Sequence, residues 1–318
     1  MIYSRILGTG GYLPERVVTN AELEQRVATT DQWIWERTGI RKRHLVSGEE
    51  TTSVLAQRAS LAAIESAGIN AADIDLIILA TSTPDRIYPA AACRVQAMLG
   101  VTDCPAFDIQ AVCTGFIYAL GIADQFIRTG SATCALVIGA DANSKILDWS
   151  DRRTCVLFGD GGGAVVLGAS DKPGLLSNHL HADGRHEQLL YVEGGVFHGY
   201  DRPASVKMQG SEVFKIAVRT LSRIVDETLA ANNLEKKDLD WLVPHQANIR
   251  IIAATAKKLG IPMEQVVVTV EEHGNTSAAS VPLALDVAVR DGRIKRDQLV
   301  LLEAFGGGFT WGSALVRY

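Results

Sequence analysis

The two halves of this sequence contain similar segments. This sign of a duplicated unit limits the choice of fold more than any other feature. The segment AGINAADIDLIILA (67–80) resembles NNLEKKDLDWLVPH (232–245) at an offset of 165 residues. A second pair, CTGFIYALGIADQFIRTG (113–130) and NTSAASVPLALDVAVRDG (275–292), aligns at an offset of 162 residues. Repeated segments in one order and at nearly constant spacing indicate two similar units that pack about a pseudo-twofold axis.

The repeat gives each half its own set of predicted strands and helices. We expect the first half to span residues 1–172 and the second to span residues 173–318. Helical patterns alternate with short apolar runs along the whole chain, which indicates an α/β fold built in layers. The apolar runs predict strands buried on both faces: DLIILAT (75–81), CALVIGA (134–140), AVVLGA (164–169), WLVPH (241–245), VVVTV (266–270) and LVLLEAF (299–305).

Composition disfavours several classes of protein. The chain has 318 residues, of which 47% are hydrophobic, and its net charge of -5 argues against a general nucleic-acid binder. It offers neither a signal-peptide pattern nor an uninterrupted apolar span of about 20 residues, so we expect a cytoplasmic protein that does not enter a membrane. Its five cysteines are widely spaced without a CxxC pair, which predicts reduced thiols rather than disulfides or a zinc site.

One of these cysteines, Cys113, lies where an apolar run gives way to a long apolar helix. Backbone N–H groups at a helix start stabilise a thiolate, so Cys113 is a candidate nucleophile. Taken alone, Cys113 would more often be a small buried core residue. Likewise, His245 alone would be a hydrogen-bonded residue at a strand end, and Asn275 alone would be a plain N-cap. The repeat, however, aligns Asn275 with Cys113 and puts His245 at a strand end, where ligands of α/β sheets gather. Together the three residues predict one shared active site.

Two other groups of residues do not suggest a site. His179, His181 and His186 have mixed spacing without a clear set of carboxylates, so we expect an exposed strand and turn rather than a metal centre. The opening GTGGYLP lacks the third glycine of a dinucleotide fingerprint, and GDGGGA (159–164) lacks the Lys-Ser/Thr of a phosphate-binding loop. We expect these glycines to serve tight turns and close packing.

Five motifs in order resemble the thiolase superfamily and, most closely, the β-ketoacyl-acyl-carrier-protein synthase III family: AVCTGF, LFGDGGGA, VPHQAN, EHGNTSAAS and the closing EAFGGGFTWGSALVRY. The resemblance implies a layered α-β-α-β-α fold of two pseudo-twofold halves, with the cysteine on the first half and the histidine and asparagine on the second. It also implies the initiating step of bacterial fatty-acid synthesis. There, a short acyl-CoA such as acetyl-CoA condenses with malonyl-acyl carrier protein and releases carbon dioxide and CoA. No metal or redox cofactor is implied.

The resemblance assigns roles around the expected nucleophile. Cys113 would hold the acyl group as a thioester, with a thiolate favoured by the helix start and by His245. His245 Nε2 and the Asn275 amide would donate to the oxygen that gains charge when malonyl loses carbon dioxide. The backbone N–H groups of Cys113 and Gly307 would form a separate oxyanion hole.

The resemblance also predicts how CoA is bound. Trp33, Arg37 and Arg152 would hold the adenine and phosphates of CoA by stacking and charge. Asn248 and Phe305 complete the predicted substrate site on this chain.

Two further surfaces are predicted to contact other proteins. Tyr88 stands where the family commonly has phenylalanine, and in the family that residue reaches across a homodimer to close the partner's acyl pocket. The cations Lys215, Arg250 and Lys257 lie on predicted helix faces and suit the acidic surface of acyl carrier protein.

Two other functions stay open from the sequence. A related synthase of the same superfamily could join longer acyl chains or make a secondary metabolite. Alternatively, the chain could be an inactive protein that binds acyl groups or CoA on the same fold, although the intact Cys113, His245 and Asn275 argue against it.

Overall fold

Each half of the chain builds one central sheet, in a computed structural model that describes residues 2–195 and 204–318. The first sheet has the order β1-β7-β6-β4-β5 and the second has the order β11-β12-β13-β8. The two sheets share a pattern: β4 runs parallel to β6 as β11 runs parallel to β12, and β6 is antiparallel to β7 as β12 is antiparallel to β13. The strands are β1 (Tyr3–Tyr12), β4 (Leu76–Ala80), β5 (Ala106–Ile109), β6 (Cys134–Ala142), β7 (Asp160–Ser170), β8 (Leu175–Ala182), β11 (Trp241–Pro244), β12 (Leu299–Gly306) and β13 (Thr310–Arg317).

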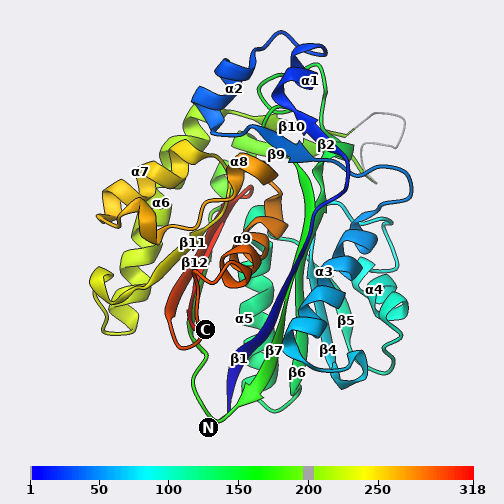
Figure 1. The fold of residues 1–318 in the computed structure, drawn as a ribbon, viewed down its shortest axis with the longest axis vertical. Helices are drawn as coiled ribbons and strands as arrows, with labels where there is room; N and C mark the ends of the chain where they lie inside the picture. Colours follow the sequence, from blue (N-terminus) through cyan, green and yellow to red (C-terminus); the bar gives the residue numbers. More distant parts are fainter. Residues whose placement is uncertain (1, 196–203) are drawn as a thin grey trace.

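Helices form three layers around the two sheets (Figure 1). Helices α5 (Gly115–Arg128) and α9 (Ser280–Arg290) lie between the sheets, and α5 is buried on nearly every side because it is apolar all round. Helices α3 (Thr52–Ala67) and α4 (Ala91–Leu99) cover the outer face of the first sheet. The outer face of the second sheet is covered by α6 (Gly210–Ala231) and α7 (Ile249–Leu259). The predicted α-β-α-β-α layering is confirmed.

Smaller elements gather at the end of the molecule away from the two termini (Figure 1). They are β2 (Val17–Thr19), α1 (Asn20–Glu24), α2 (Asp31–Thr38), β3 (Lys42–His44), β9 (Leu190–Glu193), β10 (Ser205–Met208) and α8 (Val270–His273). Among the described residues, we find no helix with the length and apolar character needed to cross a bilayer. The predicted division at residue 172 falls between β7 and β8, and it stays a prediction.

The structure corrects two details of the predicted repeat. Short 3₁₀ turns, Val112–Thr114 and Ser277–Ala279, precede α5 and α9 at an offset of 165 residues, whereas the helix ends differ by 162 because α5 is three residues longer. The counterpart of Cys113 is therefore Ala278, and Asn275 lies in the loop before the turn instead of at a helix start. The expected strand at 266–270 was wrong, because only Val266 pairs with Leu242 before α8 begins.

Candidate active site

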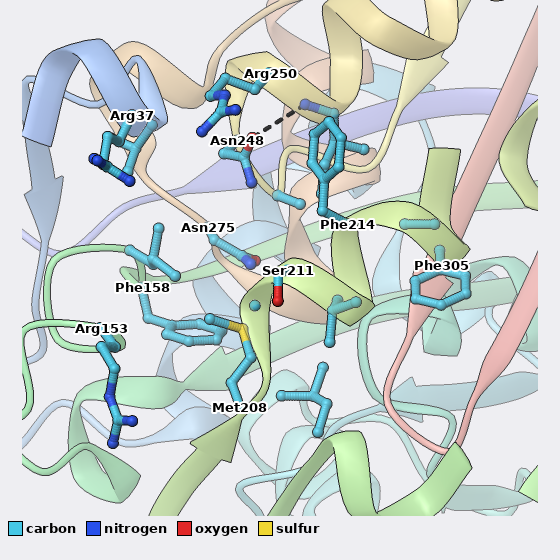
Figure 2. A pocket seen from close by; sticks show the side chains of 18 of the residues that line it. Arg37, Arg153, Phe158, Met208, Ser211, Phe214, Asn248, Arg250, Asn275 and Phe305 are labelled. Carbon is cyan, nitrogen blue, oxygen red and sulfur yellow. Dashed lines mark hydrogen bonds between the residues drawn. The ribbon is translucent and has the colours of Figure 1, made fainter. Parts of the chain in front are cut away.

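The three predicted catalytic side chains line one cavity of about 660 Å³, in which Cys113, His245 and Asn275 meet from separate parts of the chain. Figure 2 shows apolar side chains along the cavity and arginines toward its edge. Its further lining includes Val156, Leu157, Phe158, Leu190, Met208, Ser211, Val213, Phe214, Ala217, Leu221, Ala247, Ile251 and Phe305. A mostly apolar cavity with a few polar groups is typical of a binding site for a small ligand.

Cys113 lies in the 3₁₀ turn before α5 and is buried, with a neighbouring residue, Val112, at a φ of 49°. Its Sγ lies 3.6 Å from Ser277 Oγ. Burial, with a smaller contribution from the nearby Asp141 carboxylate, raises the pKa of the Cys113 thiol to about 12, although hydrogen bonds from Ser277 and the backbone lower it. Loss of solvent thus outweighs the backbone N–H group, which lowers the pKa of this thiol, and the expected contribution of the helix start to a thiolate stays a prediction.

His245 follows β11, where its backbone N–H donates to the Glu303 carbonyl at 2.8 Å. Burial lowers the pKa of His245 to about 3, so the ring is neutral at physiological pH. Nδ1 lies 2.5 Å from Ser280 Oγ, and that oxygen also accepts a bond from Gln246 N–H at 3.3 Å. When Ser280 donates its hydroxyl proton to Nδ1, the ring proton resides on Nε2. The ring then presents a donor at Nε2.

Asn275 is held by its backbone and by its side-chain oxygen. Its N–H donates to the Leu157 carbonyl at 2.9 Å, and its carbonyl accepts from Gly159 N–H at 2.9 Å. Its Oδ1 accepts from Ser277 N–H at 2.9 Å. With the oxygen engaged, the Nδ2 group is the end of the amide that can donate into the cavity.

A buried arginine supports the loop beside Asn275. The Arg43 guanidinium donates to the Val156 carbonyl at 2.9 Å and to Asn20 Oδ1 at 2.8 Å. A Cβ on Gly274 would lie 3.2 Å from Arg43 Cβ, so the loop packs directly on this side chain. Arg43 was not singled out from the sequence, because it stands in a basic run and nothing in the run marks it as the buried member. In the structure the other members of the run are more exposed.

The glycine run after β12 allows two backbones to approach closely beside the nucleophile. A Cβ on Gly306 would lie only 2.8 Å from the Cys113 nitrogen, a contact that side chains do not tolerate. Gly307 follows at the same turn, where a Cβ would lie 3.0 Å from the Leu190 carbonyl. The role of the Cys113 and Gly307 N–H groups as an oxyanion hole stays a prediction.

Aromatic and cationic groups lie toward the outside of the cavity. The guanidinium groups of Arg37 and Arg152 lie 5.1 Å and 4.8 Å from the centroid of the Trp33 ring, and all three residues line the cavity. Asn248 also lines it and caps α7, since its Oδ1 accepts from Ile251 N–H at 3.0 Å (Figure 2). Tyr88, in contrast, is 83% exposed and does not line the cavity of its own chain.

The predicted docking cations divide into two groups. Lys215 and Arg250 line the cavity, with Lys215 Nζ 2.8 Å from Glu212 and Arg250 5.6 Å from the Phe214 ring centroid. Lys257 lies in the last turn of α7 and is not part of the lining. The docking role of all three stays a prediction.

The histidines in HLHADGRH occupy β8 and the following 3₁₀ turn, a strand and a turn as predicted, but they are only partly exposed rather than exposed. His181 Nε2 lies 2.9 Å from Glu227, and its ring stacks on Trp311 with centroids 5.5 Å apart. No group of three or more residues suited to holding a metal ion occurs in the described parts of the chain.

Sequence reasoning missed the residues that orient the site. Ser277 and Ser280 stand in the quoted motif EHGNTSAAS, yet only its asparagine was singled out. Asp141, at the end of β6, was not identified either, because an aspartate after an apolar strand has many structural uses. The one signal available in the sequence was the spacing of Ser277 and Ser280, which are three residues apart at a helix start.

Comparisons with known proteins place the chain among close relatives. Family models described as 3-oxoacyl-[acyl-carrier-protein] synthase III match residues 107–184, and those of its C-terminal part match residues 229–318. A β-ketoacyl-[acyl-carrier-protein] synthase III of Thioalkalivibrio sulfidiphilus is 63% identical over 322 aligned residues, and one of Thiobacillus denitrificans is 64% identical over 319; each alignment covers 100% of both chains. The crystal structure of 3-oxoacyl-[acyl-carrier-protein] synthase III from Aquifex aeolicus is similar with a TM-score of 0.94 and 46% identity, covering 99% of this chain and 100% of that one.

Proposed function

The chain belongs to the 3-oxoacyl-[acyl-carrier-protein] synthase III family, and we propose on that premise that it catalyses the initiating condensation of bacterial type II fatty-acid synthesis. A short acyl-CoA, with acetyl-CoA expected, would acylate Cys113. Malonyl-acyl carrier protein would then lose carbon dioxide and take up the acyl group. The products would be β-ketoacyl-acyl carrier protein, carbon dioxide and CoA.

One observation carries this proposal: a thiol and two oriented neutral donors line a single apolar cavity. Decarboxylation of malonyl places negative charge on the thioester oxygen, which calls for donors rather than for a strong base. His245 is neutral and would have a donor at Nε2 when Ser280 donates to Nδ1, and Asn275 offers Nδ2 because Ser277 N–H occupies its oxygen. Each such donor typically lowers the barrier by about 3 kcal/mol.

The condensation is divided between two half-reactions. Cys113 Sγ forms a thioester with the acyl carbon, and CoA leaves with its sulfur. In the second half-reaction the enolate carbon of decarboxylated malonyl attacks that thioester, and the bond to Cys113 breaks. The close approach of Gly306 to the Cys113 nitrogen supports a role for this corner in binding the tetrahedral oxygen, with the Cys113 and Gly307 N–H groups as donors.

CoA and the carrier protein would use the same entrance. Trp33 with Arg37 and Arg152 provides an aromatic face and two cations for the adenine and phosphates. Lys215 and Arg250, on the cavity lining, would meet the acidic carrier protein, with Lys257 as a more distant contact. Asn248 and Phe305 would contact the part of the substrate that lies between the entrance and Cys113.

We also propose a cytoplasmic homodimer in which Tyr88 closes the acyl pocket of the partner. Its ring is 83% exposed beside Ile87, which is 64% exposed, and large apolar side chains in that state favour a covering surface. Sedimentation of the wild-type protein and of Tyr88→Asp would test the dimer, which we expect the substitution to weaken.

Mass spectrometry of the intact protein tests the proposed function. After incubation with acyl-CoAs of graded length, we expect Cys113 to carry acetyl or another short acyl group, and added malonyl-acyl carrier protein should remove it as β-ketoacyl product. Transfer of long acyl groups only would favour a synthase of longer chains or of a secondary metabolite. Binding of CoA without any acylation would favour an inactive binding protein.

A further inference from the structure

The Cys113 thiol has a polar neighbour that leads away from the cavity and into the protein. Its Sγ lies 3.6 Å from Ser277 Oγ, and the Ser277 side chain is also a hydrogen-bond partner of the Asp141 carboxyl. Cys113, Ser277 and Asp141 are all at most 5% exposed. The three groups therefore form a buried row from thiol to hydroxyl to carboxyl.

Asp141 is fixed by neutral donors. Its Oδ1 accepts from Ser82 N–H at 2.7 Å, from Thr81 Oγ1 at 3.1 Å and from Thr83 Oγ1 at 3.2 Å, and its Oδ2 accepts from Ala278 N–H at 3.1 Å. Burial raises the pKa of Asp141, while these hydrogen bonds lower it. Burial is the larger effect and the pKa is raised, so this carboxyl takes up a proton more readily than an exposed aspartate does.

The backbone holds Ser277 in an unfavourable conformation at this position. Its φ is 54°, in the left-handed region that costs free energy for residues other than glycine. Its N–H donates to Asn275 Oδ1, so one residue orients the enolate donor with its backbone and contacts the nucleophile with its hydroxyl. Strain of this kind persists where the surrounding structure requires the conformation.

The cavity offers few other bases for the thiol. Burial lowers the pKa of His245 to about 3, so its neutral ring is a weak base, and its Nε2 carries the ring proton when Ser280 donates to Nδ1. The reaction, however, must remove a proton from Cys113 before acylation and return one after condensation.

We propose that Ser277 and Asp141 carry the proton of Cys113 between the two half-reactions, an inference that rests on the proposed function. During acylation the Sγ proton passes to Ser277 Oγ as the hydroxyl proton passes to the Asp141 carboxylate. Sγ bonds to the acyl carbon, and CoA leaves with the electron pair and takes a proton from solvent. During condensation the new carbon–carbon bond forms, and the bond between the acyl carbon and Sγ breaks with its electron pair on sulfur. The stored proton then returns from Asp141 through Ser277 to Sγ.

Ser277→Gly tests the relay, because glycine accepts the positive φ and keeps the N–H that holds Asn275. We expect single-turnover acylation by acetyl-CoA to slow about 10²-fold, as for loss of a general base. The remaining rate should rise about tenfold per pH unit, since hydroxide must then remove the proton, whereas the wild-type rate should vary little near neutral pH. Carbon dioxide release from malonyl-acyl carrier protein should stay near the wild-type rate. Ser60→Gly, which removes an equally buried hydroxyl on α3, serves as the matched control.

Acylation of Ser277→Gly at the wild-type rate with an unchanged pH profile would overturn the relay. Equal loss of acylation and decarboxylation would overturn it too, because Ser277 would then act by placing Asn275. Should Ser277→Gly fail to fold, Asp141→Asn and the solvent deuterium isotope effect on wild-type acylation decide the matter, and an isotope effect of one counts against a relay. Alkylation of Cys113 by iodoacetamide across pH reads the same proton transfer without acyl-CoA. A relay seen by alkylation in a protein that accepts no acyl group would sink the proposed function and leave the relay standing.

Discussion

The equivalent strands β6 and β12 each end against the helix-start turn of the opposite half, yet they bring different groups there. At the end of β6, Asp141 lies under the turn that contains Ser277. Gly306, at the end of β12, is 165 residues after Asp141 and therefore its counterpart. It has no side chain and lies against the Cys113 nitrogen. Duplication thus gives two matching corners with different residues, and under the proposed function one would hold the nucleophile and the other would support the donors.

The largest expected effect tests whether the nucleophile belongs to the first corner alone. Cys113→Ser should lower acylation by on the order of 10⁴-fold or more, because a hydroxyl is far less ionised than a thiol. Intact mass after exposure to acetyl-CoA measures the effect, and circular dichroism checks the fold. Acyl-enzyme formation on residue 113 at a rate near that of the wild type would remove the case for thiol chemistry.

The second test separates the two halves by half-reaction. His245→Ala and Asn275→Ala should each slow carbon dioxide release from malonyl-acyl carrier protein by about 10²–10³-fold, because each removes one donor. Acylation of Cys113 should persist in both variants. If Asn275→Ala blocked acylation and spared decarboxylation, Asn275 would belong to the first half-reaction and the assignment would be reversed.

A third test concerns a buried position at which the halves differ. Glu303 on β12 matches Ile138 on β6, and both side chains are fully buried. Burial raises the pKa of Glu303 to about 8, so between about pH 4.5 and 8 the native state holds a proton that the unfolded state releases. The free energy of unfolding should therefore fall by up to about 1.4 kcal/mol per pH unit as the pH rises through this window.

Glu303→Ile should remove that dependence and raise the denaturant midpoint above pH 7. Urea titrations at several pH values measure both effects, and Ile138→Val serves as a control for packing at the matching site. An unchanged pH slope in Glu303→Ile would mean that this carboxyl titrates normally.

A smaller effect is expected from the residue that orients His245. Ser280→Ala removes the hydroxyl next to Nδ1 and should slow decarboxylation by roughly tenfold, in keeping with the loss of one hydrogen bond. His245 remains neutral down to about pH 3, so the defect should not change between pH 6 and 8. A loss as large as that of His245→Ala would show that Ser280 does more than set the ring proton.

The smallest effect should appear at the entrance. Arg250→Glu should weaken use of malonyl-acyl carrier protein by a few-fold at low salt while leaving acylation from acetyl-CoA nearly unchanged. Added salt should reduce the difference, because screening acts over about 8 Å at physiological ionic strength. Lys237→Glu makes the same charge change at a distant exposed site and should have no such effect. Equal effects of the two substitutions would argue against a docking patch.

Most of the architecture follows from local patterns. Each D-apolar-D segment begins at the last residue of a 3₁₀ turn, Ala71–Asp73 or Lys236–Asp238, and leads into β4 or β11, so the offset of 165 residues in the sequence is kept in the structure. The run at 266–270 failed as a strand, because apolar β-branched residues also occur in buried loops and only the neighbouring chain decides whether they pair.

The sequence by itself determined the duplication and the layers and predicted that Cys113, His245 and Asn275 share one site, because periodicity and motif order can be seen in a single chain. Only the tertiary structure decided their chemical states. Burial makes Cys113 a thiol and His245 a neutral ring, and within the second half Ser277 holds Asn275 while Ser280 holds His245. Desolvation and hydrogen-bond geometry depend on what surrounds an atom in space, and no pattern along the chain records that.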